Sequence, residues 1–423
     1  MASGQVSLTR RIIGLPRAAW VICIGMFINK FGNFLSVFLI LYLTAEGYST
    51  FQAGIALGAI GLGSFFGNGV GGTVADRIGR RWAIVVSMFG TAGFTLLVPF
   101  ASGIYVIIGL AIVIGFFSQL YRPAGGAILV DTVSESERIA AFALLRLAIN
   151  LGMSVGPVLG GLLSNISYNY LFVGNAVTSL LFGLLVLLLL PETKPAQQDH
   201  VEHVPVAAKG GYRDVFGDPA MRLYLLAMFA ATYVYVQTVA TLPLHVRDAN
   251  LSNQFYGLLL GINALIIVLV ELPLVKFTEK RSARHVMALG LLLLAFGVGS
   301  TGAADGKALL VMTVMVWTFA EMIYTPVATA YPGMLAPEDL RGRYQGAEGI
   351  AITLAQTAGP ALGGFLYAVS TTTHWVSCGV IAVIGAGLIL AAKHPGQPET
   401  PAESSLDSAA VLDGIPGQKI ADQ

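Results

Sequence analysis

The stretch Gly156-Pro157-Val158-Leu159-Gly160-Gly161 returns later in the chain as Gly359-Pro360-Ala361-Leu362-Gly363-Gly364, at an offset of 203 residues. The same offset aligns other parts of the two halves of the chain without a gap. The aligned pairs include Gly54 with Gly257, Gly58 with Gly261, Arg81 with Arg284, Tyr121 with Tyr324, Pro123 with Pro326 and Arg138 with Arg341. A repeat of this length predicts that the two halves share one fold.

The composition identifies the solvent in which that fold exists. Hydrophobic residues make up 55% of the 423 residues and charged residues only 11%, against about 25% charged in soluble proteins. This excess predicts an integral membrane protein. A net charge of +1 gives no reason to expect a nucleic-acid partner. Cys23 and Cys378 stand in apolar runs, which favours buried thiols over a disulfide.

Twelve apolar segments are long enough for a membrane crossing, which needs about 20 residues. They lie at about 17–44, 52–75, 82–101, 104–132, 139–164, 168–190, 220–247, 254–276, 284–303, 307–334, 340–368 and 372–393. The predicted organisation is an N-terminal segment 1–16, a six-helix bundle 17–190, a linker 191–219, a second six-helix bundle 220–393 and a disordered tail 394–423. We expect the first span to remain in the mature protein, because it is too long for a signal sequence.

The distribution of Lys and Arg predicts the orientation in the membrane. With a cytoplasmic N-terminus, the inner segments hold 19 of the 24 basic residues and the outer loops hold only Arg247 and Lys307. The positive-inside rule therefore places both termini in the cytoplasm. Two parallel six-helix repeats joined by a cytoplasmic linker are typical of transporters whose substrate site lies between the halves, near the membrane midplane.

The short segment between the second and third spans is rich in charge: Gly72-Thr73-Val74-Ala75-Asp76-Arg77-Ile78-Gly79-Arg80-Arg81. We expect a six-residue turn in which Asp76 accepts from a helix N-terminus or pairs with Arg77 or Arg80. Such a cluster can hold the cytoplasmic ends together in one state and release them in another. The alternative is that these arginines only orient the chain. The predicted cluster of latch residues comprises Asp76, Arg77, Arg80, Arg81, Asp131, Arg138 and Arg146, with Asp131 pairing to Arg138 or Arg146.

This segment resembles the signature loop of the major facilitator superfamily, G-x-x-x-D-R-x-G-R-R. Its degenerate copy between the eighth and ninth spans retains an acid, Glu279, opposite Asp76. The resemblance extends over residues 17–393. It implies an all-α membrane fold of twelve helices in two six-helix repeats, a small-molecule substrate and no enzymatic activity.

The fifth span carries a helix-packing motif of four glycines and one proline, namely Gly152, Gly156, Pro157, Gly160 and Gly161. Small residues four apart allow a neighbouring backbone to approach closely, and the proline bends the helix. The motif resembles that of the superfamily's drug:proton antiporters, the multidrug-resistance exporters. The basic residue that such antiporters carry early in the fourth helix is here Arg122, about three turns later.

Ionisable residues inside membrane spans are costly, which makes them candidates for function. Glu321 is the first candidate for proton coupling, because it lies mid-span where burial penalises its charged form, and Glu271 is the second. An ion pair of Glu321 with Lys30 or Arg122 is the alternative. Glu271 stands opposite Asn68 and could instead only bond across helices. The predicted substrate-cavity residues are Lys30, Asn33, Tyr121, Arg122, Tyr233, Gln237, Trp317 and Tyr324.

The sequence therefore predicts a secondary active transporter that works by alternating access. The favoured activity is proton-coupled export of amphipathic compounds by a monomer in the bacterial inner membrane. The alternative is a proton-coupled importer of a polar metabolite such as a sugar, peptide or organic acid. No cofactor is expected. No metal site is expected either, since His200 and His203 stand in the linker without further ligands.

Overall fold

The computed structural model describes residues 14–134, 137–192, 211–278 and 281–392. Most of the predicted N-terminal segment, the C-terminal tail, most of the linker with His200 and His203, and Glu279 fall outside these ranges. Within them the regular structure is helical, with no strand. Twelve of the helical segments are long and apolar enough to cross a membrane, which confirms the predicted fold class.

The first half of the chain contains six spans, two of which are broken. Its helices are α2 (Arg17–Phe31), α3 (Phe34–Ala45), α4 (Thr50–Ile78), α5 (Arg80–Leu97), α6 (Ile104–Leu120), α7 (Arg122–Thr132), α8 (Arg138–Ile166) and α9 (Asn169–Leu189). The first span breaks between α2 and α3, where a Cβ on Gly32 would lie 1.7 Å from the Thr178 hydroxyl oxygen. Only a glycine lets α9 come this close.

In the described part of the chain, the second half also contains six spans, of which only the first is broken. Its helices are α10 (Tyr212–Gly217), α11 (Pro219–Ala240), α12 (Leu242–Asp248), α13 (Asn253–Thr278), α14 (Ala283–Gly299), α15 (Lys307–Leu335), α16 (Arg341–Val369) and α17 (Thr371–Ala391). Equivalent contacts recur in the two halves. Arg81 on α5 donates to the Leu187 carbonyl of α9, and Arg284 on α14 donates to the Leu390 carbonyl of α17.

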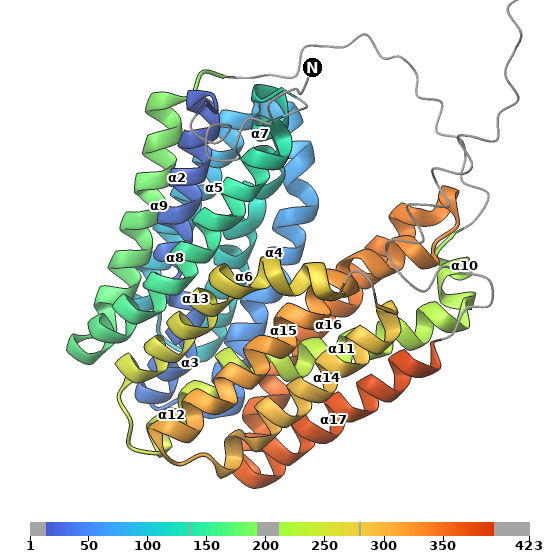
Figure 1. The fold of residues 1–423 in the computed structure, drawn as a ribbon. Coiled ribbons are helices and arrows are strands. Elements are labelled where there is room, and N and C mark those ends of the chain that lie inside the picture. Colours follow the sequence, from blue (N-terminus) through green and yellow to red (C-terminus); the bar gives the residue numbers. More distant parts are fainter. Residues whose placement is uncertain (1–13, 135–136, 193–210, 279–280, 393–423) are drawn as a thin grey trace, which may run out of the picture.

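The two bundles meet at one end and diverge at the other (Figure 1). We call the end where α2 begins the basic end, because most of the basic residues lie there. Arg247 and Lys307 lie at the opposite end. A buried cluster that includes Phe38, Tyr256 and Trp317 is shared by both halves. The other two buried clusters each belong to one half, so the halves pack together mainly toward the opposite end.

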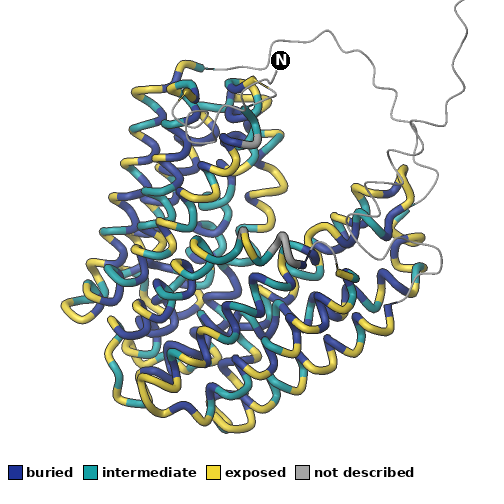
Figure 2. Tube along the Cα trace, in the orientation of Figure 1, coloured by how far each residue is buried: buried dark blue, intermediate teal, exposed yellow. Residues whose placement is uncertain are grey.

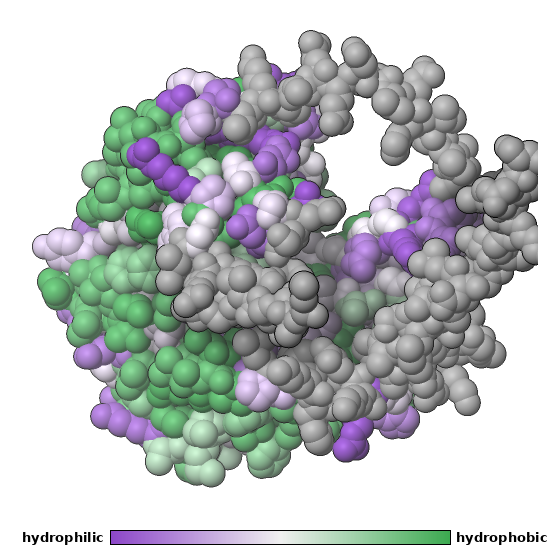
Figure 3. All heavy atoms as spheres, turned by 45° about the horizontal axis from the view of Figure 1, so that its top comes forward, coloured by the Kyte–Doolittle hydropathy of each residue, from purple (hydrophilic) through white to green (hydrophobic). Residues whose placement is uncertain are grey.

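The outer surface of both bundles is apolar. Exposed positions run along the outward sides of the helices (Figure 2). Many of these positions carry large hydrophobic side chains, such as Phe100, Tyr105 and Leu188. Figure 3 shows hydrophobic side chains over the left and lower parts of the coloured surface, with hydrophilic ones near the top and around the margins. In water such a surface would be unstable, whereas lipid tails solvate it.

The segment after α4 differs from the predicted six-residue turn. Helix α4 continues to Ile78, and Gly79 alone, at φ +96°, connects it to α5. Glycine is required there because an L side chain rarely adopts this backbone conformation. Asp76 and Arg77 therefore lie on the last turn of α4, while Arg80 and Arg81 lie on the first turn of α5.

Candidate functional site

A cavity of about 290 Å³ lies between the two halves. The first half contributes residues of α2, α3, α4 and α8, and the second contributes residues of α11, α13, α15 and α16. Most of its wall is apolar. The apolar residues that form it include Val37, Leu57, Ile60, Met153, Val236, Val239, Leu260 and Trp317. The predicted cavity residues Lys30, Asn33 and Trp317 all line it.

A second cavity of about 210 Å³ adjoins the first inside the first half of the chain. The two share Lys30, Asn33, Ser36 and Ile60 in their walls. The second cavity is polar. Its hydrogen-bonding side chains are Asn29, Lys30, Asn33, Ser36, Ser64, Thr91, Ser118, Gln119, Asn175 and Ser179. We call the first the apolar cavity and the second the polar cavity.

Glu321 on α15 lies behind the wall of the apolar cavity. The Tyr235 hydroxyl donates to Oε1 of Glu321 at 3.0 Å, and the Asn263 amide donates to Oε2 at 3.1 Å. Both donors line the cavity. Glu321 therefore reaches the cavity through two neutral hydrogen-bond donors. An ion pair with Lys30 or Arg122, the alternative in the sequence prediction, is not formed among the described residues.

Glu271 on α13 forms an ion pair with Arg146 on α8, which joins the two halves. This pair is a bond across helices, which is the alternative role expected for Glu271. The side chain of Glu271 is only 12% exposed, whereas that of Arg146 is 62% exposed. The ion pair lies partway along both helices. The closely packed contacts of the opposite end are on one side of it, and the basic end is on the other. Glu271 therefore already has a charged partner in this state, which distinguishes it from Glu321.

Five predicted cavity residues line neither cavity. Tyr121 is buried beside Phe182 at the break between α6 and α7, and its hydroxyl donates to Asn29 at 3.4 Å. Arg122, which begins α7, is exposed. The other three pack inside the second half.

Tyr233 and Gln237 share a buried face of α11, where the Gln237 amide donates to the Gly359 carbonyl at 3.1 Å. Tyr324 is buried against Gly290 of α14. Tyr233 and Gln237 therefore face α16, and Tyr324 faces α14. The contacts of a helix with its neighbours set its rotation about its own axis, and so decide which side chains face the cavity.

The predicted latch residues form a different set of contacts from those expected. Asp131 at the end of α7 pairs with Arg80, and not with Arg138 or Arg146. Arg80 also donates to the Ala127 carbonyl at 3.4 Å. This pairing follows from the extended α4, which places Arg80 on the first turn of α5 beside α7. Asp76 and Arg77 are exposed on α4, Arg81 bonds to α9 as described above, and Arg138 begins α8.

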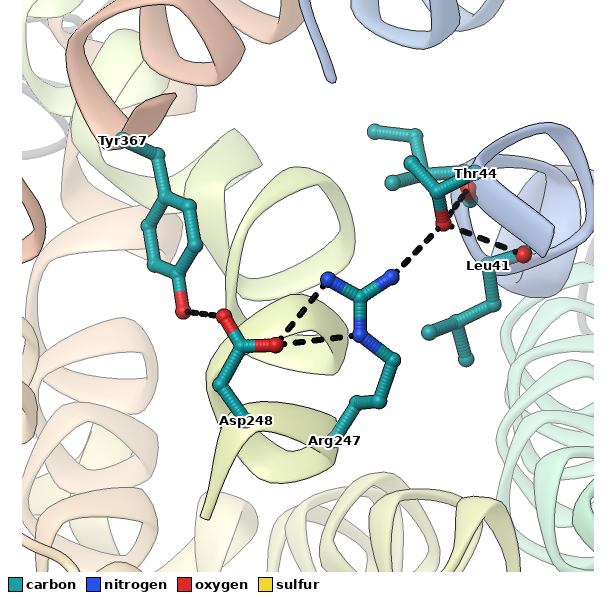
Figure 4. A network of polar contacts seen from close by, with 6 residues as sticks. Leu41, Thr44, Arg247, Asp248 and Tyr367 are labelled. Carbon is teal, nitrogen blue, oxygen red and sulfur yellow. Dashed lines mark hydrogen bonds and ion pairs between the residues drawn. The ribbon is translucent and has the colours of Figure 1, made fainter. Parts of the chain in front are cut away.

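At the opposite end a polar network joins the halves (Figure 4). Arg247 on α12 donates through Nε and Nη2 to one oxygen of Asp248, both at 3.0 Å, and through Nη1 to the Thr44 hydroxyl at 2.9 Å. The other Asp248 oxygen accepts from the Tyr367 hydroxyl at 2.8 Å. Thr44 belongs to the first half and Arg247 occupies the equivalent position of the second, 203 residues later. Equivalent positions therefore meet across the pseudo-twofold axis.

Glycines allow the two halves to approach closely beside this network. A Cβ on Gly257 of α13 would lie 2.0 Å from the Pro157 carbonyl oxygen of α8. A Cβ on Gly54 of α4 would lie 2.2 Å from the Pro360 carbonyl oxygen of α16. The repeated Gly-Pro motif thus forms both interfaces between the halves, and each is a copy of the other.

The remaining motif glycines pack within or across the halves. Gly152 and Gly156 lie against the backbone of α2, at Phe27 and Phe31. Gly160 packs on the ring of Phe38, and Gly161 lies against the backbone at Asn253 and Gln254 in the second half.

Sequence reasoning missed two features of this site. The sequence predicts Tyr233 and not Tyr235 as a cavity residue. The two tyrosines are two residues apart on one helix, and their spacing alone does not say which ring faces the cavity. The Arg247–Asp248 network was missed as well. A usable signal was present, since the 203-residue offset aligns Arg247 with Thr44 at a predicted outer loop.

The chain matches the sequence profile of the Major Facilitator Superfamily over residues 22–255 and 238–416. It is 28% identical to the MFS-type transporter YqjV of Bacillus subtilis (strain 168) over 355 residues, which covers 82% of this chain and 85% of the relative. It is 23% identical to the multidrug resistance protein MdtH of Shigella sonnei (strain Ss046), covering 81% of this chain and 85% of MdtH.

Solved structures agree in fold. The nucleoside transporter NupG has a TM-score of 0.77 at 14% identity, covering 89% of this chain and 100% of NupG. A POT family transporter in complex with a thioalcohol-conjugated peptide has a TM-score of 0.73 at 15% identity, covering 90% of this chain and 98% of the other. At such identities the likeness is one of fold.

Proposed function

Because the chain belongs to the Major Facilitator Superfamily, we propose that it is a secondary active transporter that exports amphipathic small molecules by proton-coupled alternating access. The observation that carries this proposal is the apolar cavity between the halves, with Trp317 and aliphatic side chains in its wall. Burial of an apolar body against such a wall contributes about 25 cal/mol per Å². The relation to MdtH, named as a multidrug resistance protein, is consistent with this substrate class.

The basic end is the cytoplasmic end in this proposal, by the positive-inside rule. Both termini are then cytoplasmic, and the protein is a monomer of the bacterial inner membrane. The halves diverge at the basic end and pack together at the opposite end (Figure 1). The state described here is accordingly the inward-facing one, in which substrate enters from the cytoplasm.

Glu321 is the proposed proton-coupling residue. Tyr235 and Asn263 each donate one hydrogen bond to Glu321, and both also form part of the wall of the apolar cavity. A ligand that draws either donor away removes a hydrogen bond that stabilises the charged carboxylate, and so changes its affinity for a proton. The site therefore supports coupling between substrate and proton without direct contact between them. Glu271 is the second candidate.

The polar contacts at the two ends are the proposed conformational switches. The network of Arg247, Asp248 and Tyr367 stabilises the closed opposite end. The exposed Asp76 and Arg77 on α4 would form contacts with the other half when the basic end closes. The other predicted latch residues at this end, which hold the neighbouring helices in place, are Arg80, Arg81, Asp131 and Arg138. Arg146 and Glu271 join the halves between these ends. Alternation of contacts of this kind is a known form of two-state switching.

Purified protein in proteoliposomes tests the proposal, with a fluorescent amphipathic dye and an imposed pH gradient. An exporter driven by protons should move the dye toward the acidic compartment as protons move out of it. The polar cavity favours the alternative of a polar metabolite taken up with protons, in which both move away from the acidic compartment. Dye movement that ignores the pH gradient would contradict proton coupling in either direction.

A further inference from the structure

The two adjoining cavities carry an inference about the chemical class of the substrate, which rests on the proposed function. Among the described residues that line them, Lys30 is the one lysine, arginine, aspartate or glutamate. It belongs to both walls and therefore lies where the apolar cavity meets the polar one. The other polar groups, such as Asn33 and Ser36, are neutral.

The Lys30 ammonium has no hydrogen-bond or ion-pair partner among the described residues. Glu321, the proposed proton-coupling residue, accepts hydrogen bonds from Tyr235 and Asn263 on its two carboxylate oxygens. Glu271, the second candidate for proton coupling, forms an ion pair with Arg146. The positive charge of Lys30 is therefore not neutralised by either of the membrane-embedded acids of this site.

An ammonium without a partner inside a membrane span is costly, which makes Lys30 a candidate for ligand binding. Lys30 stands 13 positions after the start of α2 at Arg17 and two positions before the break at Gly32. The first turn of α3 borders the same cavity through Leu35 and Ser36. Its partial positive charge adds to that of Lys30.

We propose that the preferred substrates are amphipathic organic anions, with the anionic group on Lys30 in the polar cavity and the apolar body in the apolar cavity. The anion supplies the missing counter-charge, and the amide nitrogens of Asn33 and Asn175 can donate to its remaining oxygens. The body packs against Trp317 and the aliphatic wall. A lipophilic cation of the same shape meets like charge at Lys30 and has no acid in the wall to bind.

Two probes with one aromatic body and opposite charge test this assignment. They are naphthalene-2-sulfonate and trimethyl(2-naphthyl)ammonium, and their affinities for the purified full chain are measured in detergent by calorimetry. The sulfonate should bind at least about 10-fold more tightly, as expected for a charge-assisted hydrogen bond in a site of low dielectric constant. Lys30→Gln should weaken sulfonate binding by about 10- to 100-fold, and it should leave the affinity of the ammonium probe unchanged or raise it, because the like charge is gone.

Two further variants act as controls. Lys30→Arg retains the charge and should restore most of the sulfonate affinity. Lys307→Gln removes an equal charge from an exposed position at the opposite end and should change neither affinity. A Lys30→Gln protein that elutes as a monodisperse peak and still binds the ammonium probe has an intact cavity.

The outcomes separate this inference from the proposed function. Equal or tighter binding of the ammonium probe, or unchanged sulfonate binding by Lys30→Gln, overturns the anion assignment and leaves amphipathic export in place. Binding of neither probe at millimolar concentration contradicts both, because the apolar cavity then holds no amphipathic body.

Discussion

Glu321 is held by two neutral donors, and this arrangement decides what its substitution should do. In Glu321→Gln the amide oxygen can accept from Asn263, and the amide nitrogen can donate to the Tyr235 hydroxyl oxygen, which both donates and accepts. We expect both hydrogen bonds to be kept in a weaker, neutral form, with a cost of up to about 1 kcal/mol in stability. The variant should therefore fold.

The functional effect of Glu321→Gln should be selective. We expect gradient-driven accumulation to disappear while substrate counterflow, which needs no net proton movement, continues in the same preparation. Glu338→Gln, a change at an exposed acid before α16, serves as the matched control and should retain both activities. Intact pH-driven accumulation in Glu321→Gln would move the coupling role to Glu271.

Asp76 is exposed in the state described here, so its substitution should not disturb this state. If it finds a partner only when the basic end closes, Asp76→Asn should slow the interconversion of states by about 10-fold. The affinity for substrate should change less than 2-fold. Single-turnover transport and equilibrium binding measure the two quantities separately. Asp339→Asn, also exposed near the basic end, is the control, and equal rates in both variants would leave Asp76 a role in chain orientation only.

At the scale of helices, the α8–α13 and α4–α16 interfaces close the opposite end through glycine. In Gly257→Leu the new side chain would overlap the Pro157 carbonyl, at which a Cβ alone would lie 2.0 Å away. Overpacking of a close interface typically costs about 1–3 kcal/mol. We expect the variant to favour the state open at the opposite end and to lose most of its transport activity.

Gly69 provides the control for Gly257→Leu. It lies on the exposed side of α4, where a Cβ meets nothing within 4 Å, so Gly69→Leu should transport normally. The motif residue Gly156 gives a second test, since Gly156→Leu should abolish transport by displacing α2 at Phe31. Full activity in both Gly257→Leu and Gly156→Leu would mean that these helix faces do not stay packed during transport.

The network around Arg247 acts on the same closed end. Arg247→Ala removes the bond to Thr44 and leaves Asp248 with Tyr367 alone. Both charged side chains are 43% exposed, so we expect a shift of only about 0.5–1 kcal/mol toward opening. The rate of maleimide labelling of a cysteine that replaces Leu57, in the cavity wall, should rise several-fold with an impermeant reagent from the outside. Lys307→Ala, which removes a charge at the same end, should not raise the labelling rate. An equal rise in this variant would mean that surface charge alone causes the effect.

At the scale of the whole molecule, the repeat made most of the fold predictable. The 203-residue offset aligned the Gly-Pro motifs, and the structure shows that they form the two equivalent interfaces. Packing, by contrast, sets the rotation of each helix, so the sequence did not distinguish Tyr235 from Tyr233. The partner of Asp131 depended on where α4 ends, and a single glycine at position 79 decided that end.

The central claim is that the two ends open in alternation, and distances across both ends test it most directly. Spin labels at Thr73 and Gly342 report on the basic end, and labels at Glu46 and Thr372 report on the opposite end; all four positions are exposed. The native Cys23 and Cys378 are buried and should label little. Pulsed electron resonance in lipid nanodiscs should show one population with a long basic-end distance and a short opposite-end distance, as here. Acidification or added substrate should enrich a second population in which the first distance shortens as the other lengthens. Two distances that stay fixed, or that lengthen together under all of these conditions, would contradict alternating access.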